Sequence, residues 1–379
     1  MPIPYGRQTI EDDDVAAVAQ TLRGDWLTQG PAVRAFEEAV ATACDAPYAV
    51  AYTSGTAALH GAALAAGAGP GDELLTSAIT FAASANCGAY VGATPVFADI
   101  DPQTWNVSAE SVRAALTPRT RMVVPVHFSG LPAPVAEIRA AVGPDVVIVE
   151  DAAHAIGARQ ADEPVGSCLH SDMAIFSFHP VKTITSGEGG VVTTRDARLY
   201  ERLVEARTHG MTKDAGRLEH PDEGGWYMEQ QSLGFNYRIT DLQAALGVSQ
   251  MAKLERFVDR RNAIAARYDE LLGDLATLRL PPAAPAGTRH GRHLYVVHHR
   301  GGADGRRRLY DGLREREIFA QVHYLPVYRH PWYRTTYGYE AGLCPHAEDY
   351  YAGCLSLPCF PALTDDEQDT VVTAVRELV

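Results

Sequence analysis

The feature that most constrains this chain is the alternation of short apolar runs with alanine-rich stretches between residues 31 and 195. The apolar runs are typical of buried strands, and the stretches between them carry apolar residues at helical spacing. Such alternation predicts a largely parallel sheet covered by helices. The expected strands are Tyr48 to Tyr52, Glu73 to Ser77, Thr94 to Ala98, Arg121 to Val126, Val146 to Val149, Met173 to Phe178 and Gly190 to Thr194.

The rest of the chain predicts a second, smaller domain. Residues 239 to 273 have the pattern of one long amphipathic helix, and the Pro- and Gly-rich segment LPPAAPAGTRHG (280 to 291) marks a change of character. A strand, a charged helix (304 to 316), another strand and a closing helix follow. We therefore expect an α/β protein, with a large domain built on a mostly parallel seven-stranded sheet over residues 1 to 250. A small C-terminal α+β domain is expected over residues 251 to 379.

Composition excludes several function classes. The chain has 379 residues, is 46% hydrophobic and carries a net charge of −14, which suits a large folded core but not a general nucleic-acid or membrane-surface binder. No run approaches the ~18 apolar residues of a membrane helix. The six cysteines form no CxxC pair, and the opening MPIPYGRQTIEDDD lacks the features of a signal peptide. We expect reduced thiols and a cytoplasmic location.

The stretch VAYTSGTAALHGAAL (50 to 64) passes from a predicted strand into a predicted helix. Free backbone N–H groups and the positive end of the helix dipole would then lie beside Ser54, Gly55 and Thr56, a geometry that binds phosphate. The alternative is that Thr53 or Ser54 only caps the helix.

The stretch VVIVEDAAHAIGA (146 to 158) ends a buried strand at Glu150 and Asp151. Open α/β sheets bind ligands at the carboxyl ends of their strands, and an aspartate there could keep a pyridine nitrogen protonated. His154 could face the same pocket one helical turn later. The alternatives are that Asp151 caps a helix and that His154 is a structural residue.

The stretch FSFHPVKTITSGEGG (176 to 190) holds Lys182, one of only three lysines in a chain with 33 basic residues. Its position after an apolar strand is a poor place for an ammonium group without a purpose. A lysine can lose its proton and form a Schiff base with an aldehyde, whereas an arginine cannot. Asp151 and Lys182 follow two successive strands, so both should reach one edge of the sheet.

Together these stretches supply a phosphate cradle, a partner for a pyridinium and an anchor for an aldehyde, with Ser177 as a further phosphate contact. This combination predicts pyridoxal 5'-phosphate as the cofactor. The motifs TSGTAALH, EDAAHAIGA, SFHPVKTITSGEGG and LGFNYRITDLQAALG also resemble the DegT/DnrJ/EryC1/StrS sugar aminotransferases, pyridoxal-phosphate enzymes of fold type I. The resemblance covers almost the whole chain.

The resemblance implies residue roles. Lys182, Asp151, His154 and His179 would be catalytic: Lys182 holds the cofactor and moves protons, Asp151 pairs with the pyridine nitrogen, His154 contacts the ring hydroxyl and His179 orients the substrate. The implied cofactor-binding residues are Ser54, Gly55, Thr56, Phe81, Asp151, His154, Ser177, Lys182, Asn236 and Arg238. The residues implied to contact a nucleotide sugar are Thr28, Gln29, Gly30, His323 and Tyr324.

The resemblance also implies the partners. Asn236 and Arg238 would reach the cofactor phosphate of a neighbouring subunit, so a homodimer with shared active sites is expected. The stretches WLTQGP, SFHPVKTITSGEGG, AQVHYLPVY and SLPC most resemble family members of pseudaminic acid biosynthesis. These use L-glutamate to aminate C4 of a UDP-linked 4-keto-6-deoxy-N-acetylhexosamine. The long acidic loop 213 to 227 leaves the exact sugar open.

Other interpretations are weaker. The chain could aminate another nucleotide-linked keto sugar or a cyclitol, or serve as a non-catalytic ligand sensor of the same fold. A sugar dehydratase is disfavoured because those relatives typically have His at the position of Lys182. GAGPGD (67 to 72) follows a helix, the wrong order for a dinucleotide motif. The histidines of HLYVVHH (293 to 299) lack Cys or acidic partners at ligand spacing, so no metal is expected.

Overall fold

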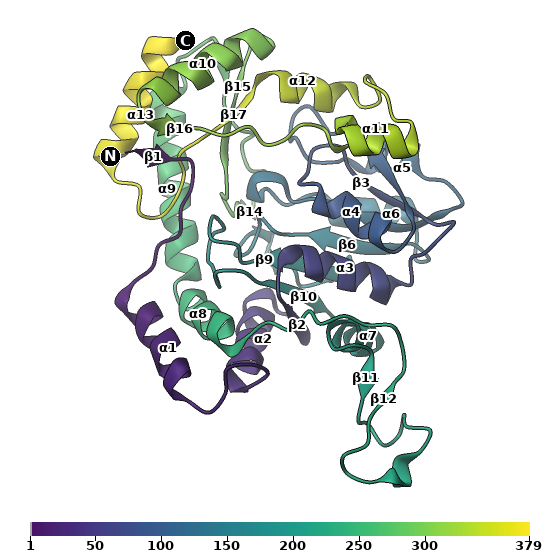
Figure 1. Ribbon diagram of the computed structural model, residues 1–379. Coiled ribbons are helices and arrows are strands. Elements are labelled where there is room, and N and C mark those ends of the chain that lie inside the picture. Colours follow the sequence, from purple (N-terminus) through teal and green to yellow (C-terminus); the bar gives the residue numbers. More distant parts are fainter. Residues whose placement is uncertain (1) are drawn as a thin grey trace.

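A computed structural model describes residues 2–379 and has a seven-stranded sheet at its centre (Figure 1). The strands follow the spatial order β2-β10-β9-β6-β5-β3-β4. They are β2 (Tyr48–Tyr52), β3 (Glu73–Ser77), β4 (Thr94–Ala98), β5 (Thr120–Val124), β6 (Val147–Asp151), β9 (Met173–Ser177) and β10 (Gly190–Thr194). Only β10 is antiparallel to its neighbours, so the predicted mostly parallel α/β sheet is confirmed.

Helices cover both faces of this sheet because alternate strand residues point to opposite sides. In β2, Val50 and Tyr52 pack with α3, whereas Ala49 and Ala51 join the core that contains α2 and the start of α9. The helices of this domain are α1 (Asp12–Arg23), α2 (Pro31–Cys44), α3 (Gly55–Ala66), α4 (Ala83–Tyr90), α5 (Ala109–Ala115), α6 (Val135–Val142), α7 (Ala197–Arg207) and α8 (Asp241–Met251). Helix α4 begins after Phe81, which leaves that ring in a loop.

The single helix predicted over residues 239 to 273 is wrong, because two helices occupy this segment. Helix α8 ends at Met251 and α9 (Leu254–Leu272) begins after Lys253. The Lys253 side chain is almost fully buried and its Nζ lies 2.6 Å from Asp14 Oδ1 and 2.8 Å from Asp13 Oδ1. The break therefore faces the acidic start of α1, a contact across some 240 residues that no local pattern shows.

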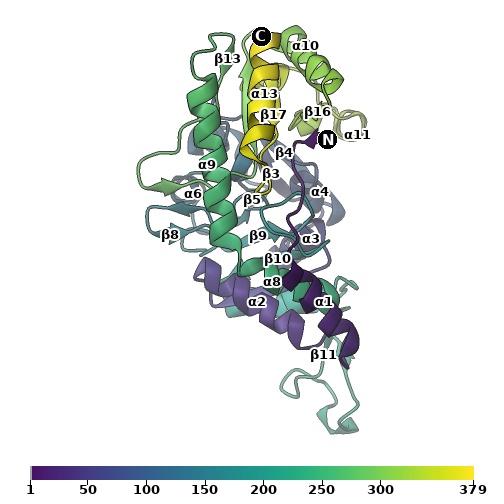
Figure 2. The same cartoon turned by 90° about the vertical axis from the view of Figure 1, so that its left-hand side faces the viewer.

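The small domain lies at the far end of α9, which runs as a straight connection along one side of the molecule (Figure 2). Its elements are β13 (Leu278–Arg279), β15 (Tyr295–His299), α10 (Gly302–Glu315), β16 (Ile318–Phe319), α11 (Pro331–Tyr337), α12 (Pro345–Gly353), β17 (Cys354–Leu357) and α13 (Asp365–Leu378). Strand β1 (Ile3–Pro4) pairs with β16, so the N-terminal segment crosses to this domain. We propose the junction of α8 and α9 as the boundary between domains 1–250 and 251–379.

The remaining elements are short. They are β7 (Arg159–Gln160), β8 (Glu163–Pro164), β14 (Thr288–Arg289) and the 3-10 turns η1 (Phe128–Gly130) and η3 (Val327–Arg329). The loop predicted over 213 to 227 forms an arm that leaves the body between β11 (Met211–Thr212) and β12 (Glu229–Gln230), with one 3-10 turn, η2 (Pro221–Glu223) (Figure 1). Within residues 2–379, the helices are all too short or too polar to span a lipid bilayer.

Replacing Lys253 with Met should lower the free energy of unfolding by about 3 to 5 kcal/mol, because Asp14 would stay buried without its cation. Burial acts to raise the pKa of the Asp14 carboxyl, but the hydrogen bond from Lys253 holds that pKa below its ordinary value. This stabilisation is therefore present at neutral pH and is lost as the pH falls below about 4. Denaturant unfolding at pH 7 and pH 3 measures both effects. Lys213→Met, on the exposed arm, is the control; equal stability of the two variants at pH 7 would contradict the prediction.

Candidate active site

A cavity of about 500 Å³ lies at the carboxyl edge of β6 and β9. It brings together most of the residues predicted for the site. Its lining includes Ser54, Gly55, Thr56, Phe81, Asp151, His154, Ser177, His179, Lys182, His323 and Tyr324, together with Tyr5, Thr80, Val126 and Glu188. The pairing that creates this edge is the parallel ladder of β6 and β9, in which Asp151 lies opposite Ile175.

The start of α3 forms one wall of the cavity. Ser54 is the N-cap residue, and its Oγ accepts from the Ala57 N–H at 3.1 Å. This cap leaves the first-turn N–H groups of Gly55 and Thr56 for another acceptor. A Cβ on Gly55 would lie 2.9 Å from the Cβ of Ser177, and a Cβ on Gly190 would lie 2.2 Å from the Ser54 carbonyl oxygen. The two glycines therefore let the helix start approach the strand ends closely enough to form an anion-binding cradle.

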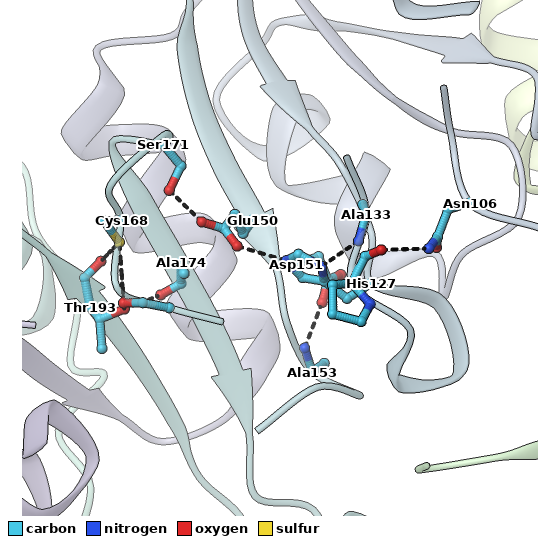
Figure 3. A network of polar contacts seen from close by, with 12 residues as sticks. Asn106, His127, Ala133, Glu150, Asp151, Ala153, Cys168, Ser171, Ala174 and Thr193 are labelled. Atoms are coloured by element: carbon cyan, nitrogen blue, oxygen red, sulfur yellow. Dashed lines mark hydrogen bonds and ion pairs between the residues drawn. The ribbon is translucent and has the colours of Figure 1, made fainter. Parts of the chain in front are cut away.

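Asp151 ends β6 and is held in place by two donors. Ser84 Oγ, on α4, donates to Oδ2 at 2.6 Å. The Ala153 N–H donates to Oδ1 at 3.1 Å (Figure 3). Asp151 is 5% exposed. A buried, hydrogen-bonded carboxylate of this kind can keep a facing ring nitrogen protonated.

Glu150 points to the other side of β6 and has a different role. His127 Nδ1 accepts from the Ala133 N–H at 2.9 Å, so its Nε2 carries the proton and donates to Glu150 Oε2 at 2.7 Å (Figure 3). Ser171 donates to the second oxygen of Glu150. This buried network fixes the turn η1 beside the strand end and is a structural support of the site.

Lys182 lies in the tight turn after β9, where its N–H donates to the His179 carbonyl at 2.9 Å. Burial lowers the pKa of the Lys182 amine to about 8, with Asp151 acting to raise it and Arg261 to lower it. A larger fraction of this amine is therefore neutral near pH 7 than for a free lysine, as a nucleophile requires.

Further residues, drawn from distant parts of the chain, line the cavity with Lys182. His154, after β6, has its Nε2 3.3 Å from the Tyr324 hydroxyl, and the Phe81 and Tyr324 rings are 6.2 Å apart across the cavity. His323 Nδ1 lies 2.8 Å from Ser356 Oγ. Burial and the nearby Lys182 lower the pKa of His323 to about 3 and that of His154 well below its ordinary value, so both imidazoles are neutral. At the mouth, His179 lies 3.9 Å from Glu188.

The other predicted residues lie elsewhere in the same chain. Gln29, Gly30 and Arg238 line a separate polar cavity of about 600 Å³ beside α2. Thr28 forms an isolated bridge with Thr240, and the exposed Asn236 forms one with Thr208. Within one subunit, these five residues do not join the cavity that holds Lys182.

Some residues of the site were missed from the sequence. Thr80 and Glu188 line the cavity, and Ser84 contacts Asp151 from α4, but nothing in the spacing singles them out. Tyr5 reaches the cavity only because β1 crosses to the small domain, a long-range pairing. Across residues 2–379, no group of three or more His, Cys, Asp or Glu side chains is arranged to bind a metal ion.

The donor set fits pyridoxal phosphate. The start of α3 with its free N–H groups, Asp151 and the Lys182 amine all line one cavity, which supplies an anion cradle, a carboxylate and a nucleophile together. The fold and this site together define an aminotransferase of fold type I.

Comparison with known proteins gives the family. Residues 8–376 match the DegT/DnrJ/EryC1/StrS aminotransferase family, and the chain belongs to it. Spore coat polysaccharide biosynthesis protein SpsC of Bacillus subtilis (strain 168) is 40% identical over 381 residues, covering 100% of this chain and 97% of SpsC.

Solved structures of aminotransferases have the same fold as this chain. PseC of Helicobacter pylori, an aminotransferase involved in the biosynthesis of pseudoaminic acid, superposes with a TM-score of 0.91 at 28% identity, covering 100% of this chain and 99% of PseC. Spr1654 of Streptococcus pneumoniae, solved in PLP and PMP forms, has a TM-score of 0.91 at 27% identity and full coverage of both chains.

In the cofactor-free protein, the rate at which a small amine-reactive reagent labels Lys182 should rise with pH and be half-maximal near pH 8. Lys253 should react only at higher pH, because its hydrogen bonds to Asp13 and Asp14 raise its pKa even though burial opposes them. Labelling across a pH series, followed by peptide mass spectrometry, separates the lysines. A Lys182 midpoint equal to or above that of Lys253 would refute the assignment.

Replacing Ser84 with Ala should slow turnover by roughly tenfold or more while cofactor binding persists, since a hydrogen bond to a charged group contributes about 1.5 to 3 kcal/mol. Steady-state kinetics and cofactor titration measure the two effects. Ser111→Ala, in the capping box of α5, is the control. Unchanged turnover in Ser84→Ala would show that the bond to Asp151 has no part in catalysis.

Proposed function

We propose that this enzyme is a UDP-4-amino-4,6-dideoxy-N-acetyl-β-L-altrosamine transaminase. It would move the amino group of L-glutamate to C4 of a UDP-linked 4-keto-6-deoxy-N-acetylhexosamine. The observation that carries the reaction type is the buried Lys182 amine in one cavity with Asp151 and the start of α3. The likeness to PseC over the whole chain supports the sugar.

Pyridoxal phosphate is the cofactor, and when bound it supplies an aldehyde for the amino group and a ring that takes up electrons. Lys182 would hold it through its amine and would carry a proton to and from the substrate carbon. Asp151 would keep the pyridine nitrogen protonated, and His154 would contact the ring hydroxyl. Phe81, 62% exposed at the cavity wall, would pack on the ring and shield it from water.

We propose a homodimer with shared active sites. Asn236 and Arg238 lie outside the Lys182 cavity of their own subunit, so a phosphate contact by these residues requires a second copy. Trp26 and Leu27, next to Thr28, are 58% and 49% exposed, and Leu233 near Asn236 is 79% exposed. Exposed apolar residues beside polar residues that are predicted to bind the cofactor and substrate fit a subunit interface.

The nucleotide sugar would then lie between subunits. His323 and Tyr324 contact it from the subunit that holds Lys182, while Thr28, Gln29 and Gly30 contact it from the partner subunit. His179 at the cavity mouth helps to orient it. The six free cysteines, all buried, suit the cytoplasmic location that we propose.

A second candidate is amination of another nucleotide-linked keto sugar or a cyclitol. The identity to SpsC, a protein of spore coat polysaccharide biosynthesis, is 40%, higher than the 28% to PseC. This favours a sugar precursor but leaves its stereochemistry to experiment. A non-catalytic sensor would bind the cofactor without turnover.

The half-reactions separate these functions. Enzyme converted with L-glutamate should lose the visible band of the covalently held cofactor and regain it when the UDP-linked 4-keto sugar of L-altro-type configuration is added. Lys182→Ala should show no such band, because the amine is absent. Loss of the band without its return would reject this sugar and keep the aminotransferase. No response to glutamate or any other amino donor would support the sensor.

Mixed dimers test the shared site. Lys182→Ala and Arg238→Ala homodimers should each be nearly inactive. A mixture of the two should regain up to about a quarter of wild-type activity. Half of the dimers in that mixture are mixed, and each mixed dimer contains one intact site out of two. Activity after refolding the mixture measures this. Failure to complement would place Arg238 outside the partner's site.

A further inference from the structure

His323 and Tyr324 line the active-site cavity from an irregular segment of the small domain. Residues 322–326 form neither helix nor strand. Backbone hydrogen bonds hold the two ends of this segment. The Gln321 N–H donates to the backbone of β17 at 3.1 Å, and the Val327 N–H donates to the backbone that follows β3 at 3.0 Å. The two cavity residues lie between these ends, so other contacts are needed to keep them in place.

Such a contact comes from Tyr350 on α12. This side chain is 2% exposed, and its hydroxyl donates to the His323 carbonyl at 2.7 Å. The Cys354 thiol is a second, longer donor to the same oxygen, at 3.6 Å. The Tyr350 ring also packs edge-on against Phe128 at 5.7 Å between centroids, and Phe128 lies 6.3 Å from the Tyr324 ring. Tyr350 therefore reaches the pair by two routes, one through its backbone and one through its aromatic ring.

Helix α12 is in turn anchored to the large domain. Its N-cap residue, Cys344, makes no side-chain cap. Instead, the carboxylate of Asp99, directly after β4, accepts from the N–H groups of His346 at 2.9 Å and Ala347 at 2.8 Å. A carboxylate at this position satisfies free N–H groups of the first turn and interacts favourably with the helix dipole. This cap between the domains fixes α12, and with it Tyr350, relative to the sheet that carries the site.

We propose that Tyr350 is a positioning residue for the second half of the reaction, which holds His323 and Tyr324 where the keto sugar binds. This inference rests on the aminotransferase function proposed above. Tyr350 is not part of the cavity lining, so it acts through the pair and does not touch the substrate. Lys182 and Asp151 are held by contacts within the large domain. The reaction with L-glutamate should therefore depend much less on Tyr350 than the reaction with the sugar does.

Tyr350→Phe tests the proposal, because it removes the hydroxyl and retains the ring. The KM for the UDP-linked 4-keto sugar should rise about five- to tenfold, the effect that one neutral hydrogen bond has on an equilibrium. The rate of the half-reaction with L-glutamate should stay within about twofold of wild type, whereas a general loss of structure would slow both half-reactions. Tyr52→Phe is the matched control: its buried hydroxyl donates to the Leu203 carbonyl on α7, also at 2.7 Å, and both values should stay unchanged.

A second measurement needs no sugar. Hydrogen–deuterium exchange of the peptide spanning 321–327 should be about five- to tenfold faster in Tyr350→Phe than in wild type or Tyr52→Phe. Asp99→Ala, which removes the cap of α12 and retains Tyr350, should change exchange and KM in the same direction, and it carries the test if Tyr350→Phe does not fold.

The two measurements separate this inference from the proposed substrate. If the wild-type enzyme does not use the UDP-linked 4-keto sugar but the exchange result is as expected, the substrate is rejected and the link from Tyr350 to His323 is supported. A folded Tyr350→Phe protein with unchanged exchange and KM would overturn the proposal. So would faster exchange with an unchanged KM, because the hydrogen bond would then only stabilise the segment.

Discussion

The parallel pairing of β6 with β9 is the constraint on which the site depends. It brings the end of one strand, with Asp151, beside the end of the next, from which the chain turns to Lys182. The third component, the start of α3, reaches the same edge because β10 lies between β2 and β9 and has a glycine where the helix approaches. Amine, carboxylate and anion cradle are therefore brought to one edge of the sheet by the backbone arrangement.

The sheet and its three motifs could be predicted because their signals are local. Each strand is a short apolar run, and Ser54, Asp151 and Lys182 each lie at or shortly after the end of one. The break between α8 and α9 could not, since it faces Asp14, far away in the sequence. Neither could the hydrogen bond of Ser84 to Asp151 nor that of Tyr350 to the His323 carbonyl, because both depend on how separate elements pack. His323 and Tyr324 were reached only through family resemblance.

The candidate residues fall into two groups on one chain. One group surrounds Lys182, and the other lies by α2 with Arg238 and exposed apolar residues. In the proposed dimer, the substrate surface would be assembled from residues that line two separate cavities of each subunit. Folding of one chain would then fix the cofactor chemistry, whereas association would fix the choice of sugar. The arm at 213 to 227 follows α7 and projects away from the body of the molecule (Figure 1).

The near absence of lysine has a consequence for how an aldehyde cofactor is loaded. Every neutral amine on a protein competes for such an aldehyde, and arginine does not. Of the three lysines, Lys253 forms ion pairs with two aspartates, and Lys213 is exposed on the arm. A surface whose positive charge comes almost entirely from guanidinium groups offers few unproductive attachment points, so the cofactor is directed to the one amine that can use it.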